Sequence, residues 1–208
     1  KVNVLGTAYA LELAHRLKVR HFVFASTIYV FSNHGSFYRT SKRAGEQLVE
    51  DYQERYGLDY SILRFGSLYG PRANETNSVH RMLTQALKER RIDYPGTGKE
   101  IREYIEVRDA AAAAVQILSK EFTNESISLT GQERMTVQEM MEMCNEIMGG
   151  GITINLQNTP DSAHYTHTPY SYTPKISKKL VRDTYIDLGL GLLDCMRTID
   201  QSRNNDSN

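Results

Sequence analysis

The chain has 208 residues, and its 25 Lys and Arg balance 25 Asp and Glu, so the formal net charge is zero. A neutral chain has no long-range attraction to nucleic acid or to an anionic membrane surface, and neither is expected as a partner. No apolar run approaches the roughly 18 residues of a membrane span. Cys144 and Cys195 form neither a disulfide framework nor a metal-ligand spacing, which predicts a cytoplasmic location and no metal.

The first third of the chain alternates predicted helices and strands. Apolar residues between Val4 and Leu17 recur at helical spacing, whereas residues 21–25 form a short apolar run of strand-forming residues. Such a run is typical of a strand buried on both faces of a parallel sheet. A long helix is predicted over 38–56, with Gly57 as its C-cap, and a second strand over 59–63.

The remaining elements continue this alternation less regularly. The triglycine at 149–151 follows a predicted helix and does not open one, so it is interpreted as a helix stop. Residues 155–174 have three prolines and one charge, which indicates an irregular loop. The other predicted elements are a helix over 78–90, a turn over 95–98, a half-exposed strand over 101–107, a helix capped by Asp109 and ending at Leu118, a strand over 126–129, a helix from Thr136 to Met148, and a last helix over 190–199.

Strands that alternate with helices of ten or more residues predict βαβ units and a parallel sheet. In such sheets ligands bind beyond the carboxyl ends of the strands. Chemistry is therefore expected in the segments that directly follow strands, which are Ser26-Thr27, residues 65–72 and Thr130-Gly131.

Tyr38 and Lys42 lie one helical turn apart, so their side chains project from one face. A tyrosine is a poor base at neutral pH, but a nearby cation favours the phenolate and is expected to lower the pKa of Tyr38. Thr27 offers a second hydroxyl at a strand end. These groups suit proton exchange with a substrate hydroxyl while a hydride leaves the same carbon. Taken alone, the Tyr–Lys pair is also common on exposed helices.

Six segments, in order, resemble the extended short-chain dehydrogenase/reductase family, which contains the nucleotide-sugar epimerases and dehydratases. The first is residues 3–7 (NVLGT), which resemble the family's helix before the catalytic strand. The resemblance extends over about residues 3–148. The other five segments are Phe24-Ala25-Ser26-Thr27, residues 37–46 (FYRTSKRAGE), residues 62–72 (ILRFGSLYGPR), residues 96–109 (GTGKEIREYIEVRD), and Leu129-Thr130-Gly131 followed by residues 136–139 (TVQE).

The resemblance implies roles for the residues at the strand ends and on the long helix. Tyr38 would be the acid/base, Lys42 would bind the nicotinamide ribose, and Thr27 would steady the substrate oxygen. Phe65 falls where the family places a residue against the nicotinamide, and Ser26 is predicted to bind the cofactor with Tyr38 and Lys42. The implied cofactor is NAD or NADP, with NAD favoured.

The resemblance also implies a nucleotide-sugar substrate held by Asn3, Ser67 and Arg102. Asn3 has an equal alternative as an N-terminal helix cap. Ser67 stands where the family usually has an asparagine. Arg102 matches an arginine that grips the nucleotide diphosphate through bidentate bonds, and its alternative is a solvated strand arginine. Arg64 and Arg72 are interpreted as structural ion-pair residues, and Glu46 as a helix-face partner of Lys42.

Two departures from the family pattern bear on the reaction. Ile28-Tyr29 follow Thr27 where the dehydratases carry Asp-Glu, and eliminating water needs an acid and a base beyond the tyrosine. This favours epimerisation or simple ketone/alcohol chemistry. The loop at 155–174 lacks the family's second diphosphate-binding arginine; it forms either a different polar pocket or a plain surface loop. The residues in question are His164, Tyr165, His167, Tyr170 and Tyr172, and the two histidines are weak evidence for a metal.

The predicted fold class is α/β, with a partial Rossmann-like parallel sheet, helices on both faces, and a small C-terminal substrate-binding lobe. Residues 1–75 with 101–130 would form the C-terminal half of the Rossmann-like domain. Residues 76–100 and 131–200 would form the lobe, and 201–208 a disordered tail.

The family's glycine-rich phosphate turn is absent from these 208 residues. The strand at 21–25 is therefore expected to be an apolar sheet edge, and we hypothesise that the 208 residues are not the whole functional unit. The predicted function is an NAD(P)-dependent nucleotide-sugar epimerase-type oxidoreductase/isomerase that transfers hydride at a sugar carbinol with help from a tyrosine. The alternatives are a net sugar reductase/dehydrogenase and a truncated, non-catalytic family member. The resemblance implies a homodimer built partly through the Tyr38 helix.

Overall fold

The computed structural model describes residues 2–159, 164–170 and 177–206, the last four as backbone only. The chain divides into two compact units. The first contains residues 1–66, 111–130 and 162–181, and the second contains 67–110, 131–161 and 182–208. None of the helices within the described residues combines the length and apolar character that crossing a membrane requires. The predicted assignment of the two parts to cofactor and substrate binding stays a prediction.

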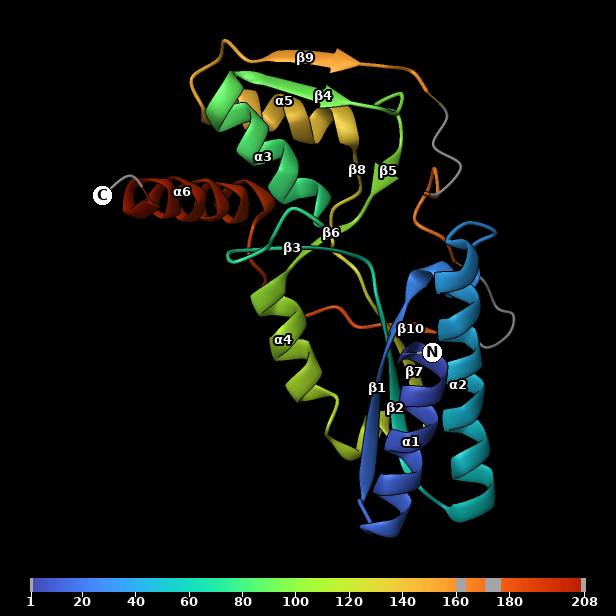
Figure 1. Cartoon of the computed structure of the whole chain (residues 1–208). Helices are drawn as coiled ribbons and strands as arrows, with labels where there is room; N and C mark the ends of the chain where they lie inside the picture. The colour runs from blue at the N-terminus through green and yellow to red at the C-terminus, as the bar shows by residue number, and fades with distance from the viewer. Residues whose placement is uncertain (1, 160–163, 171–176, 207–208) are drawn as a thin grey trace. The chain divides into compact units, whose positions relative to one another are not determined.

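The first unit is built on a four-stranded parallel sheet in the order β1-β2-β7-β10 (Figure 1). Its strands are β1 (His21–Thr27), β2 (Asp59–Phe65), β7 (Glu125–Leu129) and the short β10 (Lys178–Lys179). In register, Thr27 lies opposite Phe65, and Phe65 lies opposite Leu129. The carboxyl ends of the three longer strands therefore meet at one edge, as the predicted α/β class with a partial Rossmann-like sheet requires.

Helices cover this sheet on both faces. α1 (Val2–Arg16) and α2 (Ser36–Tyr56) pack on one side, and the C-terminal part of α4 (Val107–Gln116) lies on the other (Figure 1). The helix-covered core consists of Leu11, Ala14, Phe24, Val49, Leu58, Tyr60 and Ile62. Gly45 lets α2 approach this core, because a Cβ there would lie 2.5 Å from Phe24 Cζ. Gly57, with φ 67°, ends α2 as predicted.

Strand β1 pairs only with β2 among the described residues, so it is an edge strand, as expected. The prediction that it is buried on both faces is wrong. Val23 and Ala25 are exposed, whereas Phe24 is 7% exposed. The reason is that α1 and α2 cover only the face that carries Phe24.

A buried ion pair joins β2 to α2. Arg64 is 1% exposed and donates to both carboxylate oxygens of Glu46, Nε to Oε1 at 2.9 Å and Nη2 to Oε2 at 2.7 Å. Ser26 of β1 donates its hydroxyl to the same carboxylate. Arg64 is therefore structural, as predicted. Glu46 accepts hydrogen bonds from Arg64 and Ser26 instead of from Lys42, because α2 turns this carboxylate toward the sheet.

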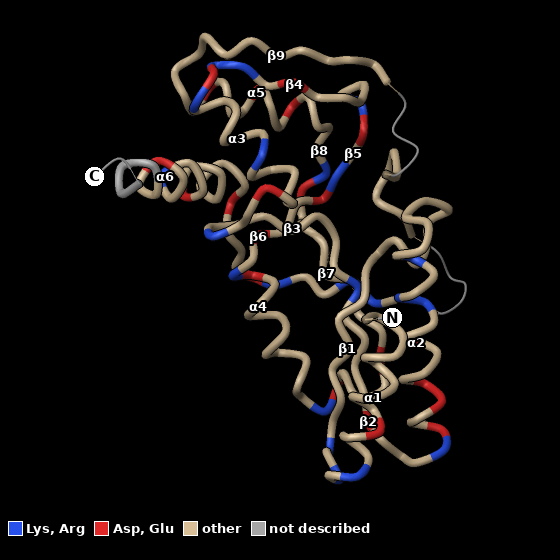
Figure 2. Tube along the Cα trace, viewed as in Figure 1, with Lys and Arg blue, Asp and Glu red and all other residues tan. Residues whose placement is uncertain are grey.

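Among its described residues, the second unit has three strand pairs, three whole helices and the first residues of α4. Its apolar core lies between α3, α5 and α6 and includes Leu83, Met140, Met141 and Leu192. Acidic and basic residues alternate from β4 to the start of α4 (Figure 2). The pairs are β3 (Ser67–Tyr69) with β6 (Tyr104–Glu106), β4 (Arg91–Tyr94) with β9 (Thr153–Leu156), both parallel, and β5 (Ile101–Arg102) with β8 (Met135–Thr136), antiparallel; the helices are α3 (Ser78–Glu89), α5 (Val137–Ile147) and α6 (Leu188–Asp206).

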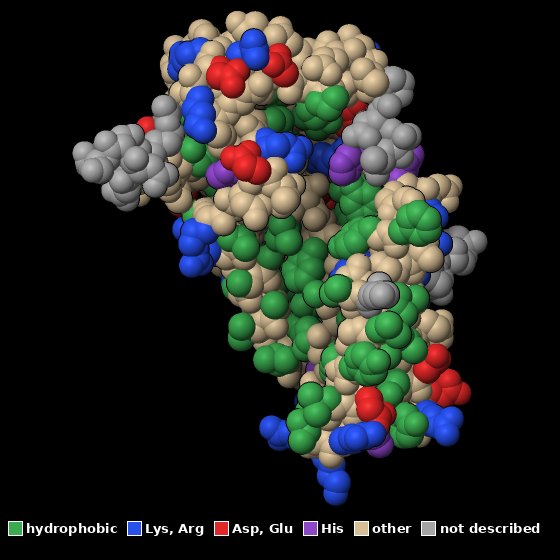
Figure 3. Space-filling view, in the orientation of Figure 1, with side chains coloured by type: hydrophobic (Ala, Val, Ile, Leu, Met, Phe, Trp, Pro, Cys, Tyr) green, Lys and Arg blue, Asp and Glu red, His purple; other side chains and the backbone are tan. Residues whose placement is uncertain are grey.

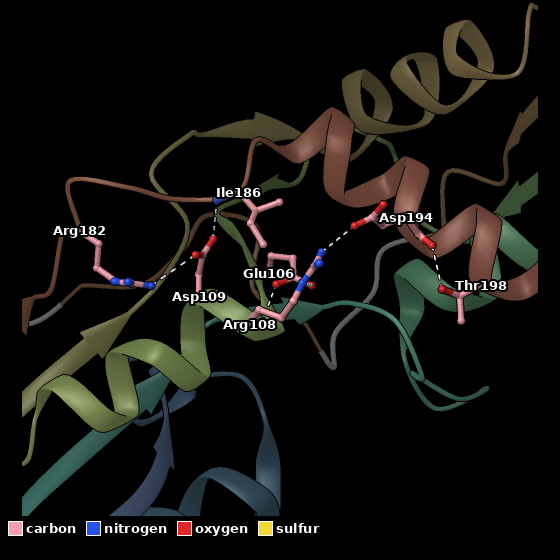
Figure 4. Close-up of polar contacts among 7 residues, drawn as sticks. All are labelled: Glu106, Arg108, Asp109, Arg182, Ile186, Asp194 and Thr198. Atoms are coloured by element: carbon pink, nitrogen blue, oxygen red, sulfur yellow. Dashed lines mark hydrogen bonds and ion pairs between the residues drawn. The ribbon is translucent and has the colours of Figure 1, made fainter.

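Asp109 is not the cap of α4, contrary to the prediction. The helix already begins at Val107, and the buried carboxylate of Glu106 accepts the Arg108 backbone N–H. Asp109 instead accepts the backbone N–H of Ile186 at 2.7 Å and faces Arg182 at 3.4 Å (Figure 4). It therefore anchors the segment that leads into α6.

Helix ends agree with the predictions at α5 and differ at α6. Thr136 caps α5 in a reciprocal capping box with Glu139, and the glycines at 149–151 all have positive φ, as a helix stop requires. α6 continues to Asp206, so residues 201–206 are helical and not a disordered tail. No glycine or proline interrupts this stretch, and Ser202 donates to the Thr198 carbonyl. Within 155–174, β9 includes 155–156, while 160–163 and 171–174, with Tyr172, lie outside the described residues.

Replacing Glu46 by Gln is expected to lower the free energy of unfolding by about 3–5 kcal/mol, because Arg64 keeps its charge in a buried place without a counter-charge. The measurement is urea unfolding followed by circular dichroism. Lys178→Gln is the matched control: it breaks a 2.7 Å ion pair whose lysine is 63% exposed, and is expected to cost under about 1 kcal/mol. Equal effects of the two substitutions would contradict a central role for the buried pair.

Candidate active site

Thr27 is the last residue of β1 and is 4% exposed. Its hydroxyl caps the short 3-10 helix η1 (Ile28–Phe31) by accepting the Tyr29 backbone N–H at 3.3 Å. The same side chain is hydrogen-bonded to the hydroxyl of Tyr38. Thr27 therefore links the end of β1 to η1 and to Tyr38 of α2.

Lys42 brings the amino-terminal part of α2 against the same strand end. Its Nζ donates to the Ala25 carbonyl at 2.7 Å and lies 5.9 Å from the centroid of the Tyr38 ring. Thr27, Tyr38 and Lys42 are therefore gathered at the carboxyl end of β1, where a parallel sheet is expected to bind its ligand.

Burial is the largest influence on the pKa values of both Tyr38 and Lys42. The pKa of Tyr38 is raised by burial, and the hydrogen bond with Thr27 opposes that rise. The pKa of Lys42 is lowered by burial, and the negative charge of Glu46 opposes that fall. The expectation that Lys42 lowers the pKa of Tyr38 is therefore wrong for this structure: the phenol is the favoured form at neutral pH.

The structure places three further predicted residues in the first unit. Phe65 lies opposite Thr27 in the sheet register, at the same strand edge. Ser26 is 4% exposed and its hydroxyl is engaged by Glu46. Asn3 donates from Nδ2 to Ser41 Oγ at 2.9 Å, which ties α1 to α2 beside Tyr38. Asn3 lies inside α1, so it is not the cap that the alternative proposed. The cofactor and substrate roles of these residues stay predictions.

Ser67 and Arg102 belong to the second unit. Ser67 is the first residue of β3 and is half-buried. Arg102 of β5 is 8% exposed and donates to the Ile101 carbonyl at 3.1 Å. This burial contradicts the alternative of a solvated strand arginine. The diphosphate role of Arg102 stays a prediction.

Sequence reasoning missed Tyr29 as a site residue. Its hydroxyl is hydrogen-bonded to His164 Nδ1, and its ring meets those of Tyr165 and Tyr38. The signal available was its position two residues after Thr27, on the same turn. Within the described residues, no group of three or more His, Cys, Asp and Glu side chains is arranged to hold a metal ion.

Comparisons with known proteins indicate the family and the fold of this chain. A family model described as "NAD dependent epimerase/dehydratase family" matches residues 1–129. The uncharacterised UDP-glucose epimerase YtcB of Bacillus subtilis is 26% identical over 169 residues, covering 75% of this chain and 54% of that protein. The UDP-glucuronate 4-epimerase of Thermodesulfobacterium geofontis is 27% identical over 161 residues, covering 71% and 50%. The chain thus spans about half the length of the curated relatives that it matches.

Solved structures share the fold. A UDP-glucuronic acid 4-epimerase from Bacillus cereus, in complex with UDP-glucuronic acid and NAD, superposes with a TM-score of 0.81 at 22% identity, covering 96% of this chain and 68% of that one. A dTDP-glucose 4,6-dehydratase from Bacillus anthracis, in complex with NAD, gives a TM-score of 0.81 at 20% identity, covering 97% and 68%.

Thr27→Val is expected to raise the pKa of Tyr38 further, because it removes a hydrogen bond that favours the phenolate. Thr27→Ser keeps a hydroxyl in place and is expected to leave that pKa close to its original value. Ultraviolet difference titration of each protein against its Tyr38→Phe counterpart isolates the Tyr38 phenolate from the other tyrosines. A higher pKa moves the appearance of phenolate to more alkaline pH. A Tyr38 that titrates below the ordinary tyrosine range would contradict the rise in pKa that burial is expected to cause.

Proposed function

Because the chain belongs to the NAD dependent epimerase/dehydratase family, we propose that this protein is an NAD-dependent nucleotide-sugar epimerase-type enzyme. It acts by tyrosine-assisted hydride transfer at a sugar carbinol. The observation that carries the proposal is the meeting of Thr27, Tyr38 and Lys42 at the carboxyl end of β1. The curated relatives include epimerases that carry UDP-sugars in their names, which supports the substrate class.

The donors at this edge fit a nicotinamide nucleotide. An ammonium carries three N–H donors, and the contact with the Ala25 carbonyl engages one of those of Lys42. Within the described residues, Lys42 is in no ion pair, so its donors suit the hydroxyls of a ribose. Phe65 adds a half-buried ring at the neighbouring strand end. When bound, NAD supplies a reversible hydride acceptor.

Tyr38 is the proton-transfer group in this proposal. As the carbon–hydrogen bond electrons leave the sugar carbon, the Tyr38 phenolate takes the hydroxyl proton and the carbinol becomes a ketone. When hydride returns to the other face of the carbonyl, the Tyr38 phenol gives the proton back to the oxygen. Thr27 shares this hydroxyl network, since its side chain is already hydrogen-bonded to Tyr38. The raised pKa of Tyr38 makes the phenol its resting form, so proton uptake improves as pH rises.

Residues after Thr27 favour epimerisation over dehydration. Eliminating water needs an acid and a base beyond the tyrosine, and Ile28 and Tyr29 supply no carboxylate there. Glu46, four residues after Lys42, is engaged by Arg64 and Ser26. Ile28 itself is 2% exposed and packs into the core.

Tyr38→Phe is expected to reduce turnover of UDP-sugars by about 10²–10⁴-fold, because it deletes the acid/base and little else. Product formation from UDP-glucose and from UDP-glucuronate, followed by chromatography, measures the effect. Tyr56→Phe is the matched control, since Tyr56 lies at the far end of the same helix. Full activity of Tyr38→Phe would refute the proposal. In the same assay, an epimerase leaves the absorbance of reduced nicotinamide unchanged over many turnovers, whereas a net reductase or dehydrogenase changes it steadily.

We also propose that the protein is a homodimer, and that its interface includes α1 in addition to the Tyr38 helix α2. Val2, Leu5, Tyr9 and Leu13 form a stripe on α1 at helical spacing, and they are 84%, 49%, 72% and 57% exposed. Apolar side chains gather over this part of the first unit (Figure 3). A contiguous apolar stripe on a helix indicates a partner surface. A second copy of the chain is the occupant that the resemblance to dimeric family members favours.

Leu13→Glu is expected to convert the dimer into a monomer, because it places a charge inside the apolar contact. Size-exclusion chromatography with light scattering measures the mass. Leu190→Glu is the matched control: this leucine is 63% exposed on α6, away from α1 in the chain, and the dimer is expected to persist. A dimer that survives Leu13→Glu would show that the stripe on α1 is not the interface.

A further inference from the structure

The backbone of Tyr29 is held firmly beside the candidate catalytic threonine. Its N–H donates to Thr27 Oγ1 at 3.3 Å, and its carbonyl accepts the Ser32 N–H at 2.9 Å. Its neighbours Ile28 and Val30 are 2% and 0% exposed, so both flanks of the turn are anchored in the core. The direction in which the Tyr29 side chain leaves the turn is therefore set by the fold.

The ring of Tyr29 is packed on three sides. The Tyr165 ring, itself 4% exposed, lies 4.9 Å away between centroids, and the Tyr38 ring meets it edge-on at 6.4 Å. Gly35 borders the third side: a Cβ there would lie 2.8 Å from Tyr29 Cδ1, and its φ of +87° favours glycine as well. Tyr29 thus forms an aromatic wall directly beside the acid/base.

The hydroxyl of Tyr29 is hydrogen-bonded to Nδ1 of His164, an exposed residue 135 positions later in the chain. A phenol and an imidazole can each donate and accept a hydrogen bond, so the pair suits a neutral hydroxyl. Such a pair offers a hydroxyl both a donor and an acceptor, whereas a carboxylate at the same place would only accept.

We propose that Tyr29 and His164 form a subsite that recognises a sugar hydroxyl next to the reacting carbon. Tyr29 is the specificity-determining residue, and His164 is a positioning residue that orients the Tyr29 hydroxyl. The inference rests on the proposed function: because the Tyr29 ring lies edge-on to the Tyr38 ring at 6.4 Å, a sugar whose carbinol lay between Thr27 and Tyr38 would bring its neighbouring ring carbons near Tyr29. Sugars carry hydroxyls on those neighbouring carbons. The segment 164–170 is accordingly part of the reaction site and not a plain surface loop.

The test compares Tyr29→Phe, His164→Ala and the double variant, with His167→Ala as the matched control from the same segment. The readouts are the dissociation constants of UDP-glucose, UDP-glucuronate and UDP by calorimetry, together with kcat, KM and the melting temperature. Tyr29→Phe keeps the ring and its packing, so the melting temperature is expected to stay unchanged. We expect Tyr29→Phe to weaken binding of at least one UDP-sugar by about 3- to 10-fold, the size of one neutral hydrogen bond, with UDP binding unchanged.

His164→Ala is expected to act in the same direction, and the double variant to be no weaker than Tyr29→Phe, because His164 acts through the Tyr29 hydroxyl. The inference is overturned if Tyr29→Phe binds the UDP-sugars as tightly as the original protein does. It is also overturned if Tyr29→Phe weakens UDP binding as much as UDP-sugar binding, or if His167→Ala weakens UDP-sugar binding as much as Tyr29→Phe does. The two proposals fail separately. If Tyr38→Phe abolishes turnover while Tyr29→Phe changes nothing, the function stands and the subsite falls. If the original protein binds none of the UDP-sugars, both fall.

Discussion

The candidate site depends on one buried ion pair. Arg64 of β2 is 1% exposed and grips both oxygens of Glu46, which also takes the Ser26 hydroxyl of β1. These three side chains fasten α2 across the carboxyl ends of the first two strands. One turn before Glu46, Lys42 then reaches the Ala25 carbonyl, and a turn earlier Tyr38 reaches Thr27. Breaking the pair would leave a guanidinium without a counter-charge in the core and loosen the helix that carries Tyr38 and Lys42.

Partial burial gives the site its electrostatic character. It raises the pKa of Tyr38 and lowers the pKa of Lys42, so each group leans toward its neutral form. The Thr27 hydroxyl opposes the first shift, and the charge of Glu46 opposes the second. Glu46 therefore has two effects: it completes the buried ion pair, and it opposes the fall in the pKa of Lys42. A cationic lysine is the form that a ribose hydroxyl would meet.

Aromatic side chains lie beside the candidate site, on the turn that follows Thr27. Tyr29 leaves the turn two residues after Thr27 and meets His164 and Tyr165, which come from far along the chain. The proposed subsite thus joins a rigid turn to a distant segment through ring packing and one hydrogen bond. In the proposed subsite, the Tyr29 ring and its hydroxyl would recognise sugar hydroxyls. Nucleotide sugars differ in the arrangement of these hydroxyls, so such a contact would distinguish between them.

The sequence by itself determined the features that depend on neighbouring residues: the one-turn spacing of Tyr38 and Lys42, the stop at Gly57, the cap at Thr136 and the alternation that predicts a parallel sheet. Hydrophobic periodicity and helix capping involve residues that are close in the sequence, so they can be predicted without knowledge of the tertiary structure. Only the tertiary structure decided which partner each polar group found. In the fold, Glu46 pairs with Arg64, Asp109 accepts the Ile186 backbone N–H, and the Tyr29 hydroxyl is hydrogen-bonded to His164. One face of β1 stays exposed. Those choices follow from packing between segments 18 to 135 positions apart, which no local pattern records.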